Sequence, residues 1–494
     1  MNRIADTSPA GGFLFPLTVL LAAALTGCMT VGPDFSRPDL EAPAVWHSSA
    51  DAGVVPGEID PRALAEWWRS LEDPVLGDLI ERAGSGNLDL RVAMARIREA
   101  RARRIQSRSP LFPSVDASAS GRKSRGSEDT GSGRESELYS AGFDSGWEID
   151  IFGGVRRSVE AAEADLAASL ADYHDVMVTL AAEVAVNYID IRTFQARMAV
   201  AEANIAAQRE TLDLVRGLYE AGAGDALAVD QATYNLESSR SRIPDLRTGL
   251  ESALNRLAVL TAQPPGSLHE ALSEMRALPT PLLEVVVGVP ADVLRRRPDI
   301  RRAEQDVAAQ TARVGVAVAD LYPRFFLNGS IGLEALSFER LLNIGHYTYG
   351  FGPSLSWTLF DAGAIRANIE VQSALQEQAL IRYEAAVLEA LEEVENAIVA
   401  FACEQQKRTA LEAAAESSRS AAELAEQEYL SGLVDFSEVL DAQRSLLSFE
   451  DQLAQSRGAV LSNLISLYKS LGGGWKPLGS TAGEFQSQSQ SDVL

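Results

Sequence analysis

The sequence repeats itself at a fixed offset, and this most limits how the chain can fold. Trp147 and Trp357 are equivalent positions 210 residues apart, and residues 87–262 match residues 297–472 without a gap. Further landmarks keep the offset: LFP with LYP (111–113 and 321–323) and YEAGAGD with YLSGLVD (219–225 and 429–435). A constant offset over so long a stretch indicates an internal duplication, so the chain should fold as two copies of one unit.

Each copy contains one very long stretch suited to a helix. Residues 155–221 contain no proline and one glycine, Gly217, and residues 364–431 contain neither residue type. At 1.5 Å per residue each stretch predicts a helix about 100 Å long, far beyond an ordinary globular helix. Two shorter helices are expected beside it, at 77–109 and 225–262 in the first copy. Their combined length approaches that of the long helix, which predicts that they stack end to end along it.

Each copy also contains two predicted strands, at 114–121 and 138–149 and then at 324–333 and 347–359. In the last of these, YTYGFGPSLSWTL, apolar residues alternate with small or polar ones, which predicts a strand with one apolar face. An apolar face opposite hydroxyls and carboxylates suits a strand between lipid and water, although a soluble sandwich would share the pattern.

Four strands are too few to close a barrel around a water-filled lumen, and open sheet edges cannot lie in lipid. The chain must therefore oligomerise. A homotrimer would supply 12 strands and 12 helical columns.

The N-terminus predicts a lipoprotein signal. The apolar run at 13–25 is too short to cross a bilayer and has the length of a signal-peptide core. The sequence LTGC that follows resembles the bacterial lipobox, so we expect residues 1–27 to be removed and Cys28 to carry lipid. The alternative is an ordinary signal peptide with a chance cysteine. Neither Met29 nor Thr30 is aspartate, which implies delivery to the outer membrane.

The composition excludes several function classes. The formal charge of −25 argues against a nucleic-acid partner. With four histidines and two cysteines a metal site is not expected. No nucleophile motif or histidine cluster indicates a catalytic site, which leaves a lipid-anchored hydrolase unsupported. A periplasmic adaptor would lack the strands and the duplication.

No run of 18 apolar residues follows the signal, so a membrane crossing would require a closed β-barrel. Cys403, within a helical run, is predicted to be buried.

Several motifs together resemble the TolC-like outer-membrane factors, and in particular their lipoprotein branch, the NodT and OprM type. The resemblance covers nearly the whole mature chain. Its landmark motifs are VGPDFSRPDLEAPAVW (31–46), WWRSLEDPVLGDLIERA (67–83), VPADVLRRRPDIRRAE (289–304), LYPRFF (321–326), GPSLSWTLFDAG (352–363) and SGLVDFSEVLDAQRSLLSFE (431–450).

The resemblance implies a mainly α fold with a membrane β-barrel: a trimeric α/β channel-tunnel with a 12-stranded barrel on a 12-helix periplasmic tunnel. It implies a passive exit duct of a tripartite efflux system, with a periplasmic adaptor and an inner-membrane pump as partners. We favour multidrug efflux, and type I protein secretion or metal efflux are the alternatives. No cofactor is expected besides the lipid on Cys28.

The expected domain map follows the duplication. Its parts are the signal peptide (1–27), an N-terminal anchor and equatorial segment (28–76), repeat 1 (77–262), an equatorial linker (263–297), repeat 2 (298–472, with helices 364–431 and 435–470) and a disordered C-terminal tail (473–494).

Two groups of site residues follow. The helix-to-helix turns at Gly222–Asp225 and Gly432–Asp435 should form the tunnel tip, where glycine permits the reversal and Asp225 and Asp435 can cap the next helix. They serve either as caps alone or also as adaptor contacts. Near the tip, Asp441 and Arg444 match family positions that constrict the periplasmic mouth, although an ordinary helical ion pair is the alternative. Ser437 stands where relatives often carry an apolar constricting residue.

Overall fold

The computed structural model describes residues 30–39, 42–48, 54–57, 60–279 and 285–475. The predicted signal peptide and Cys28 lie outside these residues, as does the tail from 476 onward. The chain divides into two units, each built from three stretches of sequence. The first unit contains residues up to 38, 96–170 and 302–384, and the second contains 39–95, 171–301 and the residues from 385 onward.

Two long helices run from the first unit into the second. Helix α5 spans Gly154–Glu220 and helix α11 spans Ala364–Leu430, and each has 67 residues. Their bounds lie within one residue of the predicted 155–221 and 364–431. Because both ends of α11 follow those of α5 by 210 residues, the repeat offset is also the offset of the structure.

The helix predicted at 77–109 is two helices, α3 (Pro74–Gly86) and α4 (Leu88–Arg108). The chain breaks at Asn87, whose Oδ1 accepts hydrogen bonds from the N–H groups of Asp89 and Leu90 at 2.8 and 3.2 Å. A side chain that accepts from its own following residues is a helix N-cap, so Asn87 starts a new helix instead of continuing the first.

The helix predicted at 225–262 is likewise divided, into α6 (Ala226–Arg240) and α7 (Arg242–Leu260). Pro244 lies in the first turn of α7. Its ring has no N–H to donate to the preceding turn, so a continuous helix is unfavourable here. In the second copy α12 runs unbroken from Phe436 to Ser470, because no proline interrupts it.

The shorter helices meet end to end in the second unit. Asn87 Nδ2, at the start of α4, donates to the carbonyl oxygen of Leu260, at the end of α7, at 2.9 Å. At the equivalent place in the second copy, Arg297 donates to the carbonyl oxygen of Ser470 at 2.8 Å, just before α10 (Pro298–Ala319). Both contacts join equivalent positions, and they confirm the predicted stacking.

The first unit carries one antiparallel sheet in the order β2-β3-β5-β6. Its strands are β2 (Ser114–Arg125), β3 (Glu135–Ile149), β5 (Arg324–Ala335) and β6 (Tyr347–Ser356). The first two strands extend beyond the predicted 114–121 and 138–149 because Lys123 pairs with Glu135 and Glu137 across them. Strand β6 ends before the predicted residue 359, because its Ser356 pairs with Arg324, the first residue of the neighbouring strand β5.

The second unit contains the largest apolar core, together with small elements from the predicted equatorial segments. The core includes the fully buried side chains of Trp67, Tyr188 and Phe401. The small elements are β1 (Val54–Pro56), α2 (Pro61–Ala65), α8 (His269–Leu272), β4 (Val285–Val287) and α9 (Pro290–Arg296), and β1 pairs with β4 in parallel. Among the helices of the described residues, none is apolar over a stretch long enough for a membrane span.

The predicted burial of Cys403 and the predicted start of the C-terminal tail are wrong. Cys403 is exposed, because it lies two residues, or about 200° of helix, from the fully buried Phe401 on α11. The predicted tail does not begin at residue 473. Gly474 N–H donates to the carbonyl oxygen of Leu64 at 3.1 Å, and the Trp475 ring stacks on His174 with centroids 4.4 Å apart.

Candidate functional site

The sheet has one apolar and one polar face. The antiparallel registers place Phe143 opposite Ile331, and Ile331 opposite Tyr349. Residues paired in this way share a face, so the odd-numbered positions form one surface. Its large apolar side chains are Val115, Tyr139, Phe143, Trp147, Ile149, Phe325, Leu327, Ile331, Leu333, Tyr347, Tyr349, Phe351 and Leu355, and charged side chains occur on it only at the outer ends of β2 and β3. This surface is suited to lipid.

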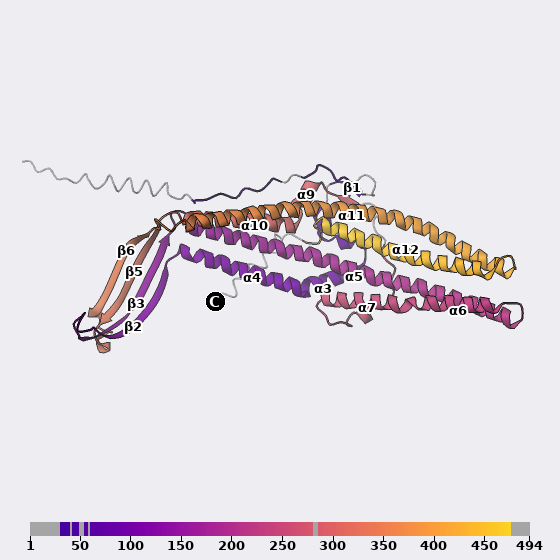
Figure 1. The fold of residues 1–494 in the computed structure, drawn as a ribbon, viewed down its shortest axis with the longest axis horizontal. Coiled ribbons are helices and arrows are strands. Elements are labelled where there is room, and N and C mark those ends of the chain that lie inside the picture. Colours follow the sequence, from indigo (N-terminus) through magenta and orange to yellow (C-terminus); the bar gives the residue numbers. More distant parts are fainter. Residues whose placement is uncertain (1–29, 40–41, 49–53, 58–59, 280–284, 476–494) are drawn as a thin grey trace, which may run out of the picture. The chain divides into compact units, whose positions relative to one another are not determined.

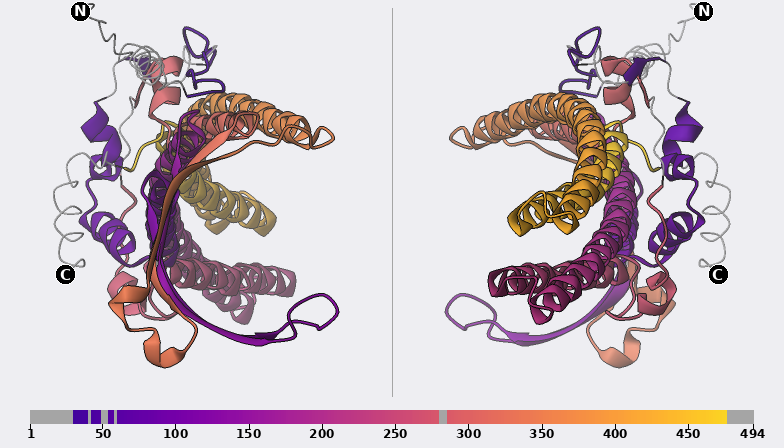
Figure 2. Two further views of the ribbon diagram at one scale, coloured as in Figure 1. Left: turned by 90° about the vertical axis from the view of Figure 1, so that its left-hand side faces the viewer. Right: turned by 90° about the vertical axis from the view of Figure 1, so that its right-hand side faces the viewer.

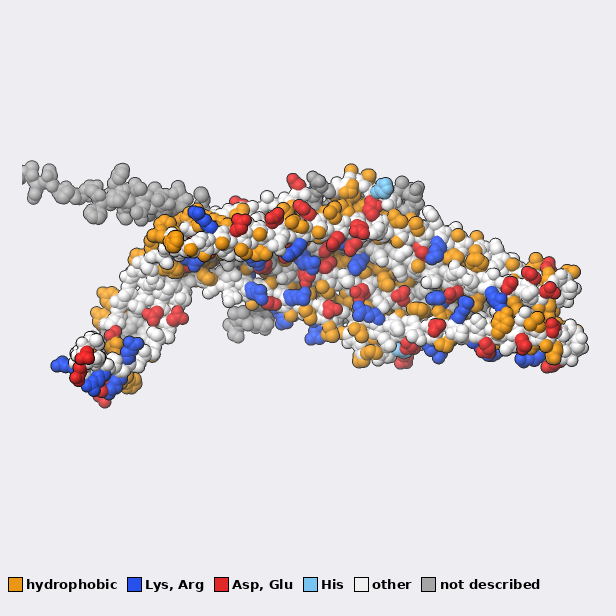
Figure 3. Space-filling model, in the orientation of Figure 1, with side chains coloured by type: hydrophobic (Ala, Val, Ile, Leu, Met, Phe, Trp, Pro, Cys, Tyr) orange, Lys and Arg blue, Asp and Glu red, His pale blue; other side chains and the backbone are white. Residues whose placement is uncertain are grey.

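The even-numbered positions form the opposite, polar surface, which is suited to water. Ser118 Oγ donates to Asp144 at 3.0 Å, and Asn328 Nδ2 donates to Ser354 at 2.9 Å. Leu138 and Phe326 are the exceptions on this face. In Figure 3 Lys, Arg, Asp and Glu side chains gather at the free end of the sheet, around the β2–β3 connection.

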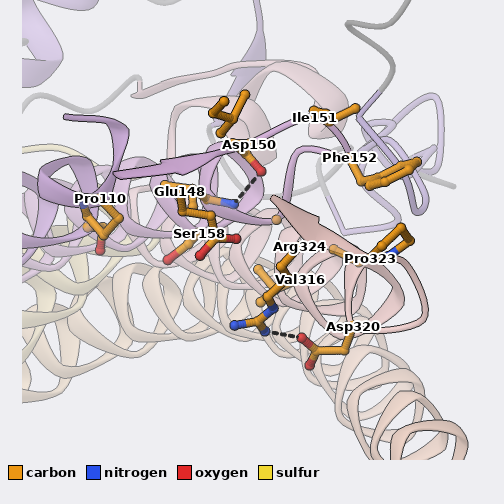
Figure 4. A pocket seen from close by; sticks show the side chains of 15 residues that line it. Pro110, Glu148, Asp150, Ile151, Phe152, Ser158, Val316, Asp320, Pro323 and Arg324 are labelled. Carbon is orange, nitrogen blue, oxygen red and sulfur yellow. Dashed lines mark hydrogen bonds and ion pairs between the residues drawn. The ribbon is translucent and has the colours of Figure 1, made fainter. Parts of the chain in front are cut away.

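The strands meet the helices at a small cavity, drawn in Figure 4. Asp150 accepts hydrogen bonds from the N–H groups of Val155 and Arg156, at 3.2 and 2.9 Å, and so caps the start of α5. Asp320 pairs with Arg324 at the start of β5. These contacts fix the chain direction at two junctions, where β3 leads into α5 and where α10 leads into β5.

Asp361 has the capping role at the start of α11. Its carboxylate accepts hydrogen bonds from the N–H groups of Gly363 and Ile365 at 2.9 and 2.6 Å. These N–H groups hold the pKa of Asp361 below its usual value, because they stabilise the charged form.

The two predicted tip turns close the helix pairs of the second unit (Figure 1). Gly222 has φ of +78° and Gly432 has φ of +72°, a region that favours glycine. Each turn is a Schellman motif: Ala223 N–H donates to the carbonyl oxygen of Leu218, and Leu433 N–H to that of Glu428, both at 2.9 Å. The backbone therefore favours glycine at both positions.

The two tip aspartates differ. Asp225 Oδ1 accepts a hydrogen bond from Leu227 N–H at 3.2 Å and so caps α6. Asp435 precedes α12, but its side chain makes no capping hydrogen bond. The expectation that both carboxylates cap therefore holds only for Asp225. The carboxylate of Asp435 points to solvent, where it is available to another molecule.

Asp441 and Arg444 lie on α12 and form an ion pair with 3.2 Å between Oδ1 and the guanidinium. Arg444 also reaches α6: it donates to the Tyr234 hydroxyl at 2.6 Å and to Asn235 Oδ1 at 3.1 Å, and its guanidinium lies over the Tyr234 ring. Ser437 is exposed one helical turn before Asp441. The predicted gate residues thus lie near one another, and Arg444 links the two repeats.

The sequence reasoning missed Tyr234 and Asn235, although a signal was present. Tyr234 is the position equivalent to Arg444 at the repeat offset. Helices α6 and α12 pack side by side, so equivalent positions on them face each other.

A groove between α11 and α12 leads from the tip to Asp441. Carboxylates dominate its charged lining, which contains Glu428, Asp435, Glu438 and Asp441. No basic side chain is among its lining residues. A negative surface of this kind attracts cations and repels anions.

The outer membrane efflux protein family model matches residues 79–263 and again residues 289–473. The chain belongs to this family. The two matches begin 210 residues apart, which is the offset of the internal repeat. The family model therefore matches each copy separately, and this confirms the duplication.

Curated relatives and solved structures agree. The chain is 31% identical to Nodulation protein T of Rhizobium leguminosarum bv. trifolii, over 93% of this chain and 97% of the relative. It is 32% identical to the pyoverdine export outer membrane protein OpmQ of Pseudomonas putida, over 95% and 98%. The outer-membrane channel OprN superposes with a TM-score of 0.86 at 38% identity, over 90% of this chain and 100% of OprN.

These findings confirm the predicted fold class, a trimeric α/β channel-tunnel with two tandem repeats in each chain. They also confirm the predicted function and location: an exit duct for efflux in the bacterial outer membrane that extends into the periplasm. The relatives are channel proteins rather than enzymes.

Proposed function

We propose that the channel carries small organic molecules, delivered by an inner-membrane pump through a periplasmic adaptor. The two-faced sheet supports the channel itself, because an apolar face toward lipid leaves a mostly polar face for a water-filled lumen. The names of three relatives, which refer to pyoverdine export and to solvent and toluene efflux, support organic cargo. Accumulation of a fluorescent organic dye in cells that lack the protein, compared with complemented cells, tests the cargo class.

The homotrimer closes through the two sheet edges. Within the part of the chain that the structure describes, strands β2 and β6 each pair on one side only, which leaves backbone N–H and C=O groups without strand partners along the other side. In lipid such groups are strongly unfavourable, so β6 of one copy pairs with β2 of the next. Engineered disulfides between these two strands should give covalent trimers. Exclusively intramolecular or dimeric products would contradict this closure.

The lipid on Cys28 anchors the chain beside the sheet. Val31 N–H donates to the carbonyl oxygen of Phe152 at 3.1 Å, where β3 gives way to α5. Arg157, which is 3% exposed, holds this segment by donating to the carbonyl oxygen of Val31 and to Asp34. Cys28 is three residues before Val31, within about 10 Å of chain. Mass spectrometry of the mature N-terminus tests the proposal, and an unmodified Cys28 thiol would contradict it.

Asp441 forms the constriction at the periplasmic mouth. Three copies of this carboxylate around a narrow pore would repel one another and select cations. Single-channel conductance in planar bilayers should rise in Asp441→Ala, and its cation preference should fall. Arg444→Ala should also raise the conductance, because it releases α12 from Tyr234 on α6. Asp245→Ala, an exposed carboxylate in the first turn of α7, is the matched control.

The outcomes of this experiment separate the parts of the proposal. Wild-type conductance in Asp441→Ala would place the constriction elsewhere and leave the channel intact. A higher single-channel conductance in Ser437→Leu than in the wild type would show that the small serine side chain is not what keeps the mouth wide. Equal effects of Asp245→Ala and Asp441→Ala would reduce the result to a general effect of surface charge.

The adaptor contacts the tip turns around Gly222, Asp225, Gly432 and Asp435. Asp435 is the cleanest probe because its side chain makes no cap hydrogen bond, so Asp435→Lys alters charge without removing a helix cap. We expect this substitution to weaken adaptor binding in a purified two-component assay while the channel stays folded. Unchanged binding would remove Asp435 from the interface.

A further inference from the structure

The connection between β5 and β6 is unusually apolar for a loop at the outer end of a membrane channel. It runs through LSFERLLNIGH, residues 336–346. Four of its large apolar side chains project from the surface, with exposed fractions of 74% for Leu336, 70% for Phe338, 86% for Leu342 and 84% for Ile344. Large apolar side chains are normally buried away from water. Their exposure here therefore indicates that something outside this chain covers them.

The neighbouring connection shows that the location does not demand apolar residues. The β2–β3 connection, GSEDTGSGR at 126–134, lies at the same end of the sheet and contains no large apolar residue. The contrast is therefore specific to the β5–β6 connection.

The connection folds toward the apolar face of the sheet. Phe338 makes an edge-to-face contact with Tyr139, ring centroids 5.8 Å apart, and Tyr139 belongs to the odd-numbered, apolar surface. In Figure 2 the connection projects from the convex side of the curved sheet. The exposed side chains are thus continuous with the lipid-facing surface of the strands.

Aromatic side chains place this region at the membrane boundary. Tyr347 follows the connection directly and stacks on Tyr349, with centroids 6.3 Å apart, on the same apolar surface. Tyrosine is enriched where acyl chains meet headgroups, at both rims of outer-membrane barrels. The connection therefore ends at the boundary, and the contact of Phe338 with Tyr139 holds its first half beside the same apolar surface.

We propose that the β5–β6 connection, residues 336–346, inserts its apolar side chains into the outer leaflet and anchors the channel at its external rim. The occupant of this surface is acyl lipid, because the surface continues the lipid-facing side of the sheet. Arg340 and His346 on the same connection lie at headgroup level. Each channel is then held at two heights, by this connection outside and by its N-terminal segment on the periplasmic side.

The test measures which molecules reach the connection. Leu342→Cys, in a chain with Cys403→Ser and with Cys28 retained because its proposed lipid blocks the thiol, is labelled with an environment-sensitive fluorophore and reconstituted as the trimer in phosphatidylcholine–phosphatidylglycerol vesicles. Phospholipids with a nitroxide on the acyl chain report contact with lipid, and aqueous iodide reports contact with water. Thr130→Cys, on the polar β2–β3 connection, is the matched control. Ile344→Cys repeats the measurement at a second apolar position, in case the first variant fails to form trimers.

We expect the label at Leu342 to emit at shorter wavelength than the label at Thr130, and to lose fluorescence with nitroxide lipid but not with iodide. The control should show the reverse. Iodide quenching at Leu342 equal to that at Thr130 would overturn the proposal. Protection from both quenchers would also overturn it, because a neighbouring subunit would then cover the surface. Conductance of the same vesicles shows whether the channel itself is intact, which separates this result from a failure of the channel.

Discussion

Gly458 on α12 allows close contact with α5. It is buried, and a Cβ at this position would lie 2.0 Å from Oγ1 of Thr193, 2.9 Å from its Cγ2 and 3.0 Å from its Cβ. Rotation of the Thr193 side chain can move Oγ1 and Cγ2, but the two Cβ atoms are fixed by their backbones. Gly458→Ala therefore forces α5 and α12 apart.

The magnitude follows from two opposed effects. Alanine in place of glycine stabilises an open helix by about 1 kcal/mol. Overpacking a close contact costs about 1–3 kcal/mol. Because the clash involves the backbone-bound Cβ atoms, the second effect should dominate, and we expect Gly458→Ala to lower the free energy of unfolding by about 1–2 kcal/mol.

Thermal unfolding of the purified protein in detergent, followed by circular dichroism, measures this effect. Gly217→Ala is the matched control, because it also lies in a long helix but nothing lies within 4 Å of a Cβ there. Its unfolding midpoint should rise, whereas that of Gly458→Ala should fall. The exchange Thr193→Gly with Gly458→Ala should recover most of the loss, since one Cβ then again separates the helices. Equal midpoints for Gly217→Ala and Gly458→Ala would refute the reasoning.

Three further predictions concern the second unit. Asp225→Ala should destabilise the first turn of α6 by about 1 kcal/mol, measured by amide hydrogen exchange, whereas Asp435→Ala should leave α12 unchanged because that carboxylate caps nothing. Burial lowers the pKa of His174 to about 4 from an ordinary value of 6.5, so the unfolded chain binds its proton first. Stability should therefore fall by about 3 kcal/mol between pH 6.5 and pH 4, and denaturant titrations of His174→Gln should lack this loss. Tyr188→Phe removes the hydroxyl that donates to Asp73 at 2.5 Å, and we expect the free energy of unfolding, measured by denaturant titration, to fall by about 1–3 kcal/mol; an unchanged value would contradict this prediction.

The long-range architecture could be predicted because it depends on periodic patterns. Absence of proline over 364–431 and the alternation in 347–356 each involve many residues, so single exceptions do not hide them. The helix breaks at Asn87 and Pro244 were missed, although both residues carry a local signal: an N-capping side chain in one case and a missing N–H in the other.

The sequence predicted which residues form the candidate site, but it did not predict the hydrogen bonds that these residues make. The turn glycines could be read from the sequence because φ above zero favours glycine at both positions. The lack of a cap at Asp435 could not, because an aspartate before a helix has the same sequence signal whether or not its side chain turns inward. The repeat offset makes Tyr234 the equivalent of Arg444, but the hydrogen bonds from Arg444 to Tyr234 and Asn235 also depend on how α6 and α12 pack, which the periodicity of one helix does not encode.

Helices α5 and α11 have the same length, 67 residues, although their sequences have diverged widely. One residue inserted into a helix would rotate every later side chain by about 100°, and one inserted into a strand would exchange its two faces. Substitutions could therefore accumulate one at a time in each copy after the duplication, whereas changes of length would have had to occur in whole turns or in pairs. Length, more than residue identity, is the inherited property of this chain, and a search for distant descendants should weight the spacing of its landmarks above their letters.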